Sequence, residues 1–181
     1  MTNLSLELRE KLKQNYTMCN FEILSKQESS DGTKKYLFDV LDGNAIETVL
    51  MEYHHGKTIC VSSQIGCKMG CKFCASTGIA FVRGLTAGEI VEQILAVEQD
   101  IGEHISNIVF MGIGEPFDNY DNVMEFLRIL NYPNGFEIGA RHITVSTCGI
   151  VPKIKEFANF DLQVNLACLL YTSDAADEED S

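Results

Sequence analysis

Residues 67–74 read CKMGCKFC, so that Cys67, Cys71 and Cys74 are separated by three and then by two residues. The chain has seven cysteines in 181 residues, an odd number, and three of them lie in this short stretch. A disulfide framework needs paired cysteines and an oxidising compartment, whereas a tight cluster is typical of metal binding or redox chemistry. The stretch therefore predicts a loop that holds a metal centre.

The composition bounds the class of protein to which such a loop belongs. Hydrophobic residues make up 45% and charged residues 22% of the chain, as in ordinary globular domains. No apolar run approaches a membrane span, and the first residues, MTNLSLELREKLKQ, lack the apolar stretch of a signal peptide. We therefore expect a cytoplasmic protein with no membrane partner. The net charge of -12 counts against RNA binding by this chain alone, since nucleic-acid-binding proteins usually carry a basic patch.

Before the cysteine loop, the pattern predicts one helix and a hairpin. Leucines at every fourth position predict a short amphipathic helix near residues 5–15. Two apolar-rich runs flank the Asp-Gly pair at residues 42–43, which predicts a hairpin over residues 34–53. The run TICVSSQ, residues 58–64, then predicts a strand that leads into the cysteines.

After the loop, helices alternate with strands. Thr86 and Glu89 have the spacing of a capping box, and the helix that follows has Ile90, Ile94, Val97 and Ile101 on its predicted buried face. We expect helices at residues 121–130 and 151–158, and strands at residues 107–112, 142–147 and 162–167. Strands and helices that alternate with short loops indicate parallel βαβ units, in either a barrel or a doubly wound sheet.

The cysteine spacing favours an iron-sulfur cluster over zinc. Structural zinc sites usually use two pairs of ligands, whereas this loop has one tight triplet and no matching second pair. Three thiolates on a four-iron cluster leave one iron without a protein ligand, and an open position is what a catalytic metal site needs. A zinc site, or three loop cysteines without a metal, is the alternative.

A second motif, MGIGEP at residues 111–116, follows a predicted strand. Its Gly112, Gly114 and Glu115 would lie at the carboxyl end of that strand, where α/β barrels have their active sites. Phe117 takes the third glycine position of G-x-G-x-x-G, so the motif is not a dinucleotide fingerprint. Glycines let a ligand approach the backbone and a carboxylate can hold an ammonium group, although for the motif taken alone a plain strand-to-helix turn is the favoured explanation.

The cysteine triplet, with Phe73 before its last member, resembles the signature of the radical S-adenosylmethionine (SAM) superfamily. A narrower resemblance extends over residues 1–167. It is to the bacterial enzymes that methylate C2 of adenine in 23S ribosomal RNA and transfer RNA. The C8-adenine methyltransferases are the nearest alternative, and Pro116 favours the C2 enzymes. Six motifs carry this resemblance in order: ETVLM, CVSSQIGC, CKFCASTG, R-x-LTAGEI, MGIGEP and ITVSTCGIVPKI.

The resemblance implies a fold and two cofactors. The fold class would be α/β, a partial (β/α) radical SAM barrel with about four βα units of six, preceded by a β-hairpin and a short N-terminal helix. The cofactors would be a 4Fe-4S cluster and SAM, which is cleaved reductively to a 5'-deoxyadenosyl radical. Residues matched to the cluster are Cys67, Cys71 and Cys74, and residues matched to SAM are Phe73, Gly114, Glu115, as the acceptor of the amine, and Ser146.

The resemblance also implies two catalytic residues and a set of partners. Glu47 matches a proposed proton acceptor, and Cys60 matches a cysteine that forms a disulfide to release the methylated base. Partners would be 23S rRNA, tRNA and a low-potential electron donor such as flavodoxin or ferredoxin. Each residue also has an ordinary reading: a hairpin surface residue for Glu47, a small buried hydrophobe for Cys60 and a polar strand residue for Ser146.

The remaining cysteines, histidines and loop lysines receive no role in catalysis. Cys19 and Cys148 are predicted to be structural, and His54 and His55 to lie on the surface. Lys68 and Lys72, in the cysteine loop, are weak candidates for phosphate contacts.

Four segments are expected from the resemblance: residues 1–20 as the last helix of an accessory domain, 21–56 as a hairpin extension, 57–167 as an incomplete radical SAM core and 168–181 as a non-native acidic tail. The tail begins CLLYTSDAADE, which resembles a translated sequencing adapter; a natural acidic tail is the alternative. The family continues past VNLA with Ser-Leu-His and a methyl-carrying cysteine. This chain is therefore expected to be an inactive fragment, and Cys168 not the methyl carrier.

A protein of another class would explain the cysteines differently. Cys60, Cys67, Cys71 and Cys74 could form a four-thiolate zinc site in a binding module without catalysis. The position of Cys60 inside a predicted strand counts against this hypothesis.

Overall fold

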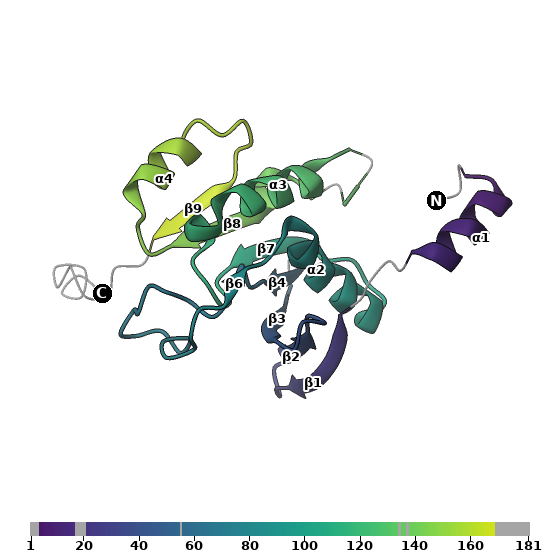
Figure 1. The fold of residues 1–181 in the computed structure, drawn as a ribbon, viewed down its shortest axis with the longest axis horizontal. Coiled ribbons are helices and arrows are strands. Elements are labelled where there is room, and N and C mark those ends of the chain that lie inside the picture. Colours follow the sequence, from purple (N-terminus) through teal and green to yellow (C-terminus); the bar gives the residue numbers. More distant parts are fainter. Residues whose placement is uncertain (1–3, 17–20, 55, 134, 137, 169–181) are drawn as a thin grey trace.

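The computed structural model describes residues 4–16, 21–54, 56–133, 135–136 and 138–168. Its centre is a seven-stranded sheet in the order β1-β2-β3-β4-β7-β8-β9 (Figure 1). The tail expected at residues 168–181 lies outside this part of the chain except for Cys168, as do Cys19 and His55. The strands of the sheet are β1 (Glu22–Glu28), β2 (Lys34–Asp39), β3 (Ala45–Tyr53), β4 (Gly56–Cys60), β7 (Asn107–Phe110), β8 (Ile143–Thr147) and β9 (Asn165–Cys168).

The second half of the sheet is parallel, which confirms the predicted βαβ pattern. Strands β4, β7, β8 and β9 pair in parallel in that order. Helix α2 (Ala87–Ile101) lies between β4 and β7 in the chain, α3 (Tyr120–Asn131) between β7 and β8, and α4 (Val151–Phe157) between β8 and β9. The fold class is thus α/β, with the arrangement of a partial (β/α) barrel. The short helices η1 (Pro116–Asn119) and η2 (Ala140–His142) precede α3 and β8.

The first half of the sheet is antiparallel and larger than the predicted hairpin. Strands β2 and β3 pair as expected, with Lys35 opposite Val49, and β3 continues into β4. Strand β1 is an addition that the hydrophobic pattern does not predict, because all of its residues are exposed.

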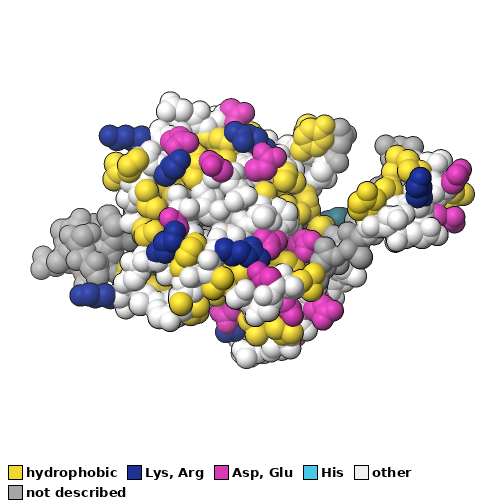
Figure 2. Space-filling view, viewed as in Figure 1, with side chains coloured by type: hydrophobic (Ala, Val, Ile, Leu, Met, Phe, Trp, Pro, Cys, Tyr) yellow, Lys and Arg dark blue, Asp and Glu magenta, His cyan; other side chains and the backbone are white. Residues whose placement is uncertain are grey.

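Figure 2 shows one face of the molecule, on which Lys and Arg side chains are interspersed with Asp and Glu.

The core lies between the helices and one face of the sheet. Ile90, Ile94 and Val97 of α2 are fully buried, as predicted, whereas Ile101 is only partly buried. The apolar residues on the inner face of α3 are also fully buried: Val123, Phe126, Leu127 and Leu130. Helix α1 (Leu6–Asn15) has no buried residue and lies apart from the sheet in Figure 1. None of the helices in the described ranges is long and apolar enough to cross a membrane. Burial of apolar surface contributes about 25 cal/mol per Å², so these side chains of α2 and α3 stabilise the fold together with the buried strand residues that they contact.

One buried polar side chain ties α2 to the strands. The side-chain oxygen of Gln93, which is 0% exposed, accepts hydrogen bonds from the Thr48 hydroxyl and the Ser62 amide, both at 2.8 Å. Its nitrogen donates to the carbonyl of Ser62 at 2.9 Å. Ser62 continues the chain after β4, where no ladder satisfies both of its backbone groups. The side chain of Gln93 therefore supplies the hydrogen bonds that the backbone amide and carbonyl of Ser62 need, in the segment that leads into the cysteine loop.

We expect Gln93→Ala to lower the free energy of unfolding by about 2–4 kcal/mol, because it leaves the buried amide and carbonyl of Ser62 without partners. Urea denaturation monitored by circular dichroism measures this loss. Gln99→Ala, an exposed position on the same helix, is the control and should change stability by less than about 0.5 kcal/mol. Equal losses in the two variants would contradict the role of Gln93.

Candidate functional site

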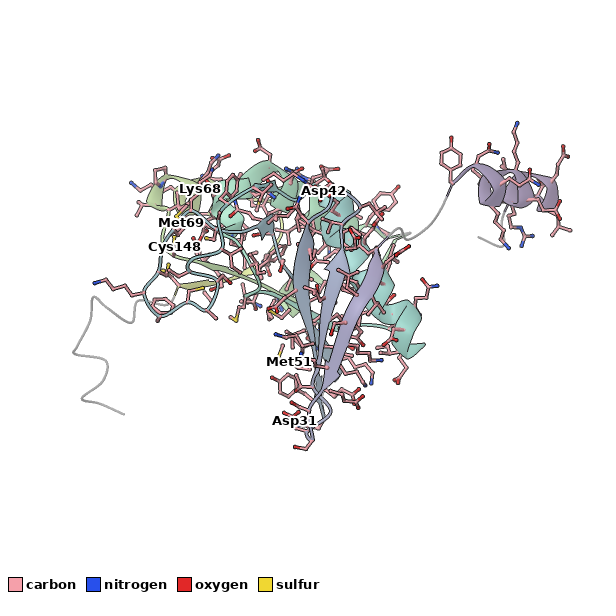
Figure 3. The ribbon with its side chains drawn as sticks, turned by 60° about the horizontal axis from the view of Figure 1, so that its bottom comes forward. Asp31, Asp42, Met51, Lys68, Met69 and Cys148 are labelled. Carbon is pink, nitrogen blue, oxygen red and sulfur yellow. The ribbon has the colours of Figure 1, made fainter. Side chains whose placement is uncertain are left out.

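A cavity of about 380 Å³ lies at the carboxyl ends of β7, β8 and β9, against the loop between β5 (Gln64–Ile65) and β6 (Arg83–Gly84). This volume is within the usual range for small-molecule sites. Figure 3 shows Lys68, Met69 and Cys148 close together at this end of the sheet, far from Asp31 in the turn between β1 and β2. The loop contributes Cys67, Met69, Cys71, Phe73, Cys74 and Ser76 to the wall.

The cysteine loop is shaped by its own backbone hydrogen bonds. At its base the amide of Cys67 donates to the carbonyl of Ile79 at 3.4 Å, and β5 pairs with β6. Within the loop, the amide of Cys74 donates to the carbonyl of Cys71 at 3.1 Å, and the hydroxyl of Thr77 donates to the same carbonyl. The three thiols therefore face one cavity without any regular secondary structure between them.

The thiols of Cys71 and Cys74 lie close enough to Cys67 to affect its pKa. Burial raises the pKa of Cys67, and the charges of Cys71 and Cys74 act in the same direction. Thiolates are soft ligands that suit iron-sulfur clusters and zinc, so the donor set fits the cluster implied by the sequence. Across the described ranges, no three His, Cys, Asp or Glu side chains lie close enough to hold a single metal ion.

The turn after β7 presents Glu115 to the opposite wall of the cavity. Its side chain is buried, with 4% exposed, and its Oε1 accepts hydrogen bonds from the amide of Phe117 at 2.9 Å and the hydroxyl of Thr147 at 2.6 Å. Its Oε2 accepts a hydrogen bond from the amide of Cys148 at 2.8 Å. The carboxylate thus fastens the turn to the end of β8.

Gly114 is required by both its conformation and its contacts. It has a φ of 105°, which L side chains rarely adopt. A Cβ built on it would lie 2.5 Å from the Cβ of Gln64. Gln64, on β5, also accepts a hydrogen bond from the amide of Glu115 at 2.9 Å. The glycine allows the turn to lie directly against the strand that begins the cysteine loop.

The end of β8 forms the third wall and includes a cysteine for which the sequence predicts only a structural role. Ser146, Thr147 and Cys148 all line the cavity, next to Ala167 and Cys168 of β9. Burial, together with a hydrogen bond to Glu115, raises the pKa of Cys148 to about 12. Cys148 is therefore a protonated thiol in the wall of the site, and no local pattern in the sequence indicates this position.

Seven of the predicted site residues line this one cavity: Cys67, Cys71, Phe73, Cys74, Gly114, Glu115 and Ser146. The other two, Glu47 and Cys60, are not among its lining residues. Their strands place them on the same sheet face as Ser146, because Cys60 pairs with both Val49 and Val109 and side chains two residues apart share a face. The Glu47 carboxylate accepts a hydrogen bond from Lys35 at 2.9 Å, and Cys60 is buried.

Two polar residues that support the site, Gln64 and Asp118, are not indicated by any local sequence pattern. Gln64 and Asp118 are joined by a hydrogen bond of 2.8 Å across 54 positions of the chain. Lys68 donates to the same Asp118 oxygen at 3.0 Å. Lys68, which the sequence offers as a weak phosphate contact, is thus paired with a carboxylate. His54 is exposed, as predicted.

Comparison with known proteins agrees with this site. The profile of the radical SAM superfamily matches residues 61–168, which is more than half of the chain and includes the loop, the Gly-Glu turn and the end of β8. The chain belongs to the radical SAM superfamily. This confirms the resemblance predicted from the cysteine spacing.

Two of the most similar curated proteins are named as RNA methyltransferases. The chain is 56% identical over 176 residues to a protein of Staphylococcus carnosus named probable dual-specificity RNA methyltransferase RlmN, and 54% identical over 172 residues to a protein of the same name from Clostridium novyi. It covers 48% and 50% of these relatives, whereas 96% and 94% of the chain is matched. The chain therefore spans about half the length of the curated relatives it matches.

A solved structure gives the same result for the fold. The crystal structure of a radical SAM methyltransferase from Sphaerobacter thermophilus superimposes with a TM-score of 0.83 at 44% identity. The match covers 92% of this chain and 50% of that protein. The α/β sheet with its parallel half is therefore the radical SAM fold.

We expect Gly114→Ala to lower the free energy of unfolding by about 2 kcal/mol or more, because it adds a steric clash with Gln64 to an unfavourable backbone conformation. Gly43→Ala is the matched control: its φ is 83°, but nothing lies within 4 Å of a Cβ there, so about 1 kcal/mol of backbone strain is expected. Thermal and urea unfolding measure both variants. Equal losses would show that contact with Gln64 does not matter.

We expect Cys60 to react with iodoacetamide at least roughly tenfold more slowly than Cys74 at pH 8, because burial raises the pKa of Cys60 while Cys74 is exposed. Peptide mass spectrometry after timed labelling of the metal-free chain measures the two rates. In urea the difference should disappear. Similar rates in the folded chain would mean that Cys60 is accessible.

Proposed function

We propose that the chain is the central part of a radical SAM methyltransferase that modifies C2 of adenine in 23S rRNA and tRNA through a methyl-cysteine intermediate. The observation that carries the proposal is the convergence of three loop cysteines, the Gly-Glu turn and Ser146 on one cavity. The names of the relatives support RNA as the substrate class. This activity is proposed for the whole protein, of which the chain covers about half.

Cys67, Cys71 and Cys74 would ligate a 4Fe-4S cluster with one open iron, and SAM would bind beside it in the cavity. When bound, the pair supplies a strongly oxidising carbon radical after one-electron reduction. The chain's contribution is to hold both groups in one orientation and to limit access of water. Phe73, Gly114 and Ser146 line the wall where SAM would lie.

Glu115 is suited to hold the ammonium group of SAM. A carboxylate has about four acceptor positions, and three of those of Glu115 are taken by Phe117, Thr147 and the amide of Cys148. The fourth faces the thiol of Cys148, which is a weak donor. No ion pair joins Glu115 to a cation in the described segments. An ammonium group would displace the thiol and balance the buried charge.

Glu47 and Cys60 are proposed as proton acceptor and resolving cysteine. The sheet places both on the same face as Ser146, which supports a common chamber. Cys60 is buried with a raised pKa, so it would be protonated until a base removes its proton. Lys35, whose ammonium group lies 2.9 Å from the Glu47 carboxylate, would fix the orientation of that side chain.

The proposed partners are rRNA, tRNA and a low-potential flavodoxin or ferredoxin, in the cytoplasm. The overall negative charge of the chain makes the other half of the protein the better source of phosphate contacts. Pro116, which begins η1 directly after Glu115, is the residue that favours C2 over C8 as the target.

Anaerobic reconstitution of the chain with iron and sulfide tests the proposal. We expect a brown protein with about four iron and four sulfide per chain, measured by metal analysis, visible absorption and electron paramagnetic resonance of the reduced form. Cys71→Ser should lose the cluster, because it removes a ligand. A colourless protein with one zinc per chain would contradict the proposal.

Cys60→Ser distinguishes the cluster from a four-thiolate zinc site. If Cys60 is a resolving cysteine, iron and sulfide contents stay at the wild-type level, since it is not a ligand. Loss of metal from Cys60→Ser would instead favour the zinc-binding module. Its burial outside the cavity wall supports the first outcome.

A further inference from the structure

The cysteine loop is attached to the rest of the molecule at a second place besides its base. Lys68, next to the first cysteine, donates from its ammonium group to Oδ2 of Asp118 at 3.0 Å. The same ammonium group lies 4.1 Å from the centre of the Phe81 ring, within the range of a cation–π contact. One lysine thus connects the start of the loop to η1 and to the returning end of the loop.

Asp118 is itself held by a buried residue. The side-chain nitrogen of Gln64 donates to Oδ2 of Asp118 at 2.8 Å, and the side-chain oxygen of Gln64 accepts from the amide of Glu115 at 2.9 Å. Gln64 is 1% exposed; its hydrogen bond with the amide of Glu115 is buried, and its hydrogen bond to Asp118 is partly buried. The contacts therefore run without a break from Lys68 through Asp118 and Gln64 to Glu115, and on to the amide of Cys148.

We propose that Lys68, Asp118 and Gln64 form a clasp that positions the cysteine loop against the Gly-Glu turn. They act through Cys67 and Glu115 and are positioning residues for the cofactors. The identity of those cofactors rests on the proposed function, whereas the clasp is defined by contacts of the chain alone.

The energetics favour this role for Lys68 over that of an isolated surface charge. An exposed ion pair contributes little because water screens it and the side chain loses entropy. Here the side chain of Asp118 is only 23% exposed and that of Lys68 is 50% exposed. The acceptor oxygen is already oriented by Gln64, so less entropy is lost when Lys68 binds. Sites that bind a cofactor depend on such support, since small displacements of a ligand residue weaken binding.

Lys72 provides a control within the same loop. It carries the same charge, is exposed, and has no ion pair or hydrogen bond assigned in the described structure. Replacing either lysine by Met removes one positive charge from the loop, but only Lys68→Met opens the clasp. Lys68→Arg keeps a donor for Asp118 and serves as the conservative variant.

Hydrogen exchange of the metal-free chain tests the clasp directly. Amides of residues 67–76 should exchange roughly two- to fivefold faster in Lys68→Met and in Asp118→Asn, with α2 unchanged. Lys72→Met and Lys68→Arg should match the wild type. The double variant Lys68→Met/Asp118→Asn should be no faster than either single variant, because both remove the same interaction. Unchanged exchange in Lys68→Met, or equal acceleration in Lys72→Met, would overturn the proposal.

A spectroscopic measurement tests the positioning role. In the reconstituted chain, addition of SAM should change the electron paramagnetic resonance spectrum of the reduced cluster in the wild type and in Lys68→Arg, and roughly two- to fivefold more SAM should be needed in Lys68→Met. The same SAM dependence in Lys68→Met and wild type would limit the clasp to a structural role. If the wild type takes up no iron, the proposed function fails while the exchange experiment still decides the clasp.

Discussion

The site depends on one buried carboxylate. Glu115 lies where the turn after β7 meets the end of β8, and it accepts hydrogen bonds from both segments. A buried charge is tolerated only where donors satisfy it, so the turn and the strand end must keep their relative positions for the carboxylate to remain buried. Because the amide of the same residue is bound by Gln64, this constraint extends to β5 and to the start of the cysteine loop.

The sheet separates the source of stability from the source of chemistry. Side chains alternate between the two faces of each strand, and the helices cover the face that carries Ile46, Ile59, Ile108 and Val145, all fully buried. The opposite face carries Cys60 and Ser146, and the carboxyl ends of the parallel strands lead to the cavity. Polar residues in the site can therefore be held by backbone amides and side-chain amides without interrupting the apolar core.

Local patterns in the sequence predict the core and the ligands, and long-range polar contacts account for what they miss. Thr86 and Glu89 form the expected capping box, because both partners lie within one helical turn. The cysteine spacing predicts a metal-binding loop because all three candidate ligands lie on one short segment. Strand β1 has no apolar alternation to reveal it, since it pairs through its backbone at an exposed edge. Gln64 and Asp118 are 54 positions apart, and neither has a local signal.

The distribution of charge around the cavity suits a cation better than an anion. Glu115 adds a buried negative charge to a wall of thiols, which become thiolates when they bind a metal. The positive charge of Lys68, the basic residue next to the first cysteine, is paired with the carboxylate of Asp118. Under the proposed function, the cavity would therefore offer soft, negatively charged ligands to iron and a carboxylate to an ammonium group. A phosphate group would meet no uncompensated positive charge from Lys68, so an RNA substrate would need its backbone contacts outside this part of the loop.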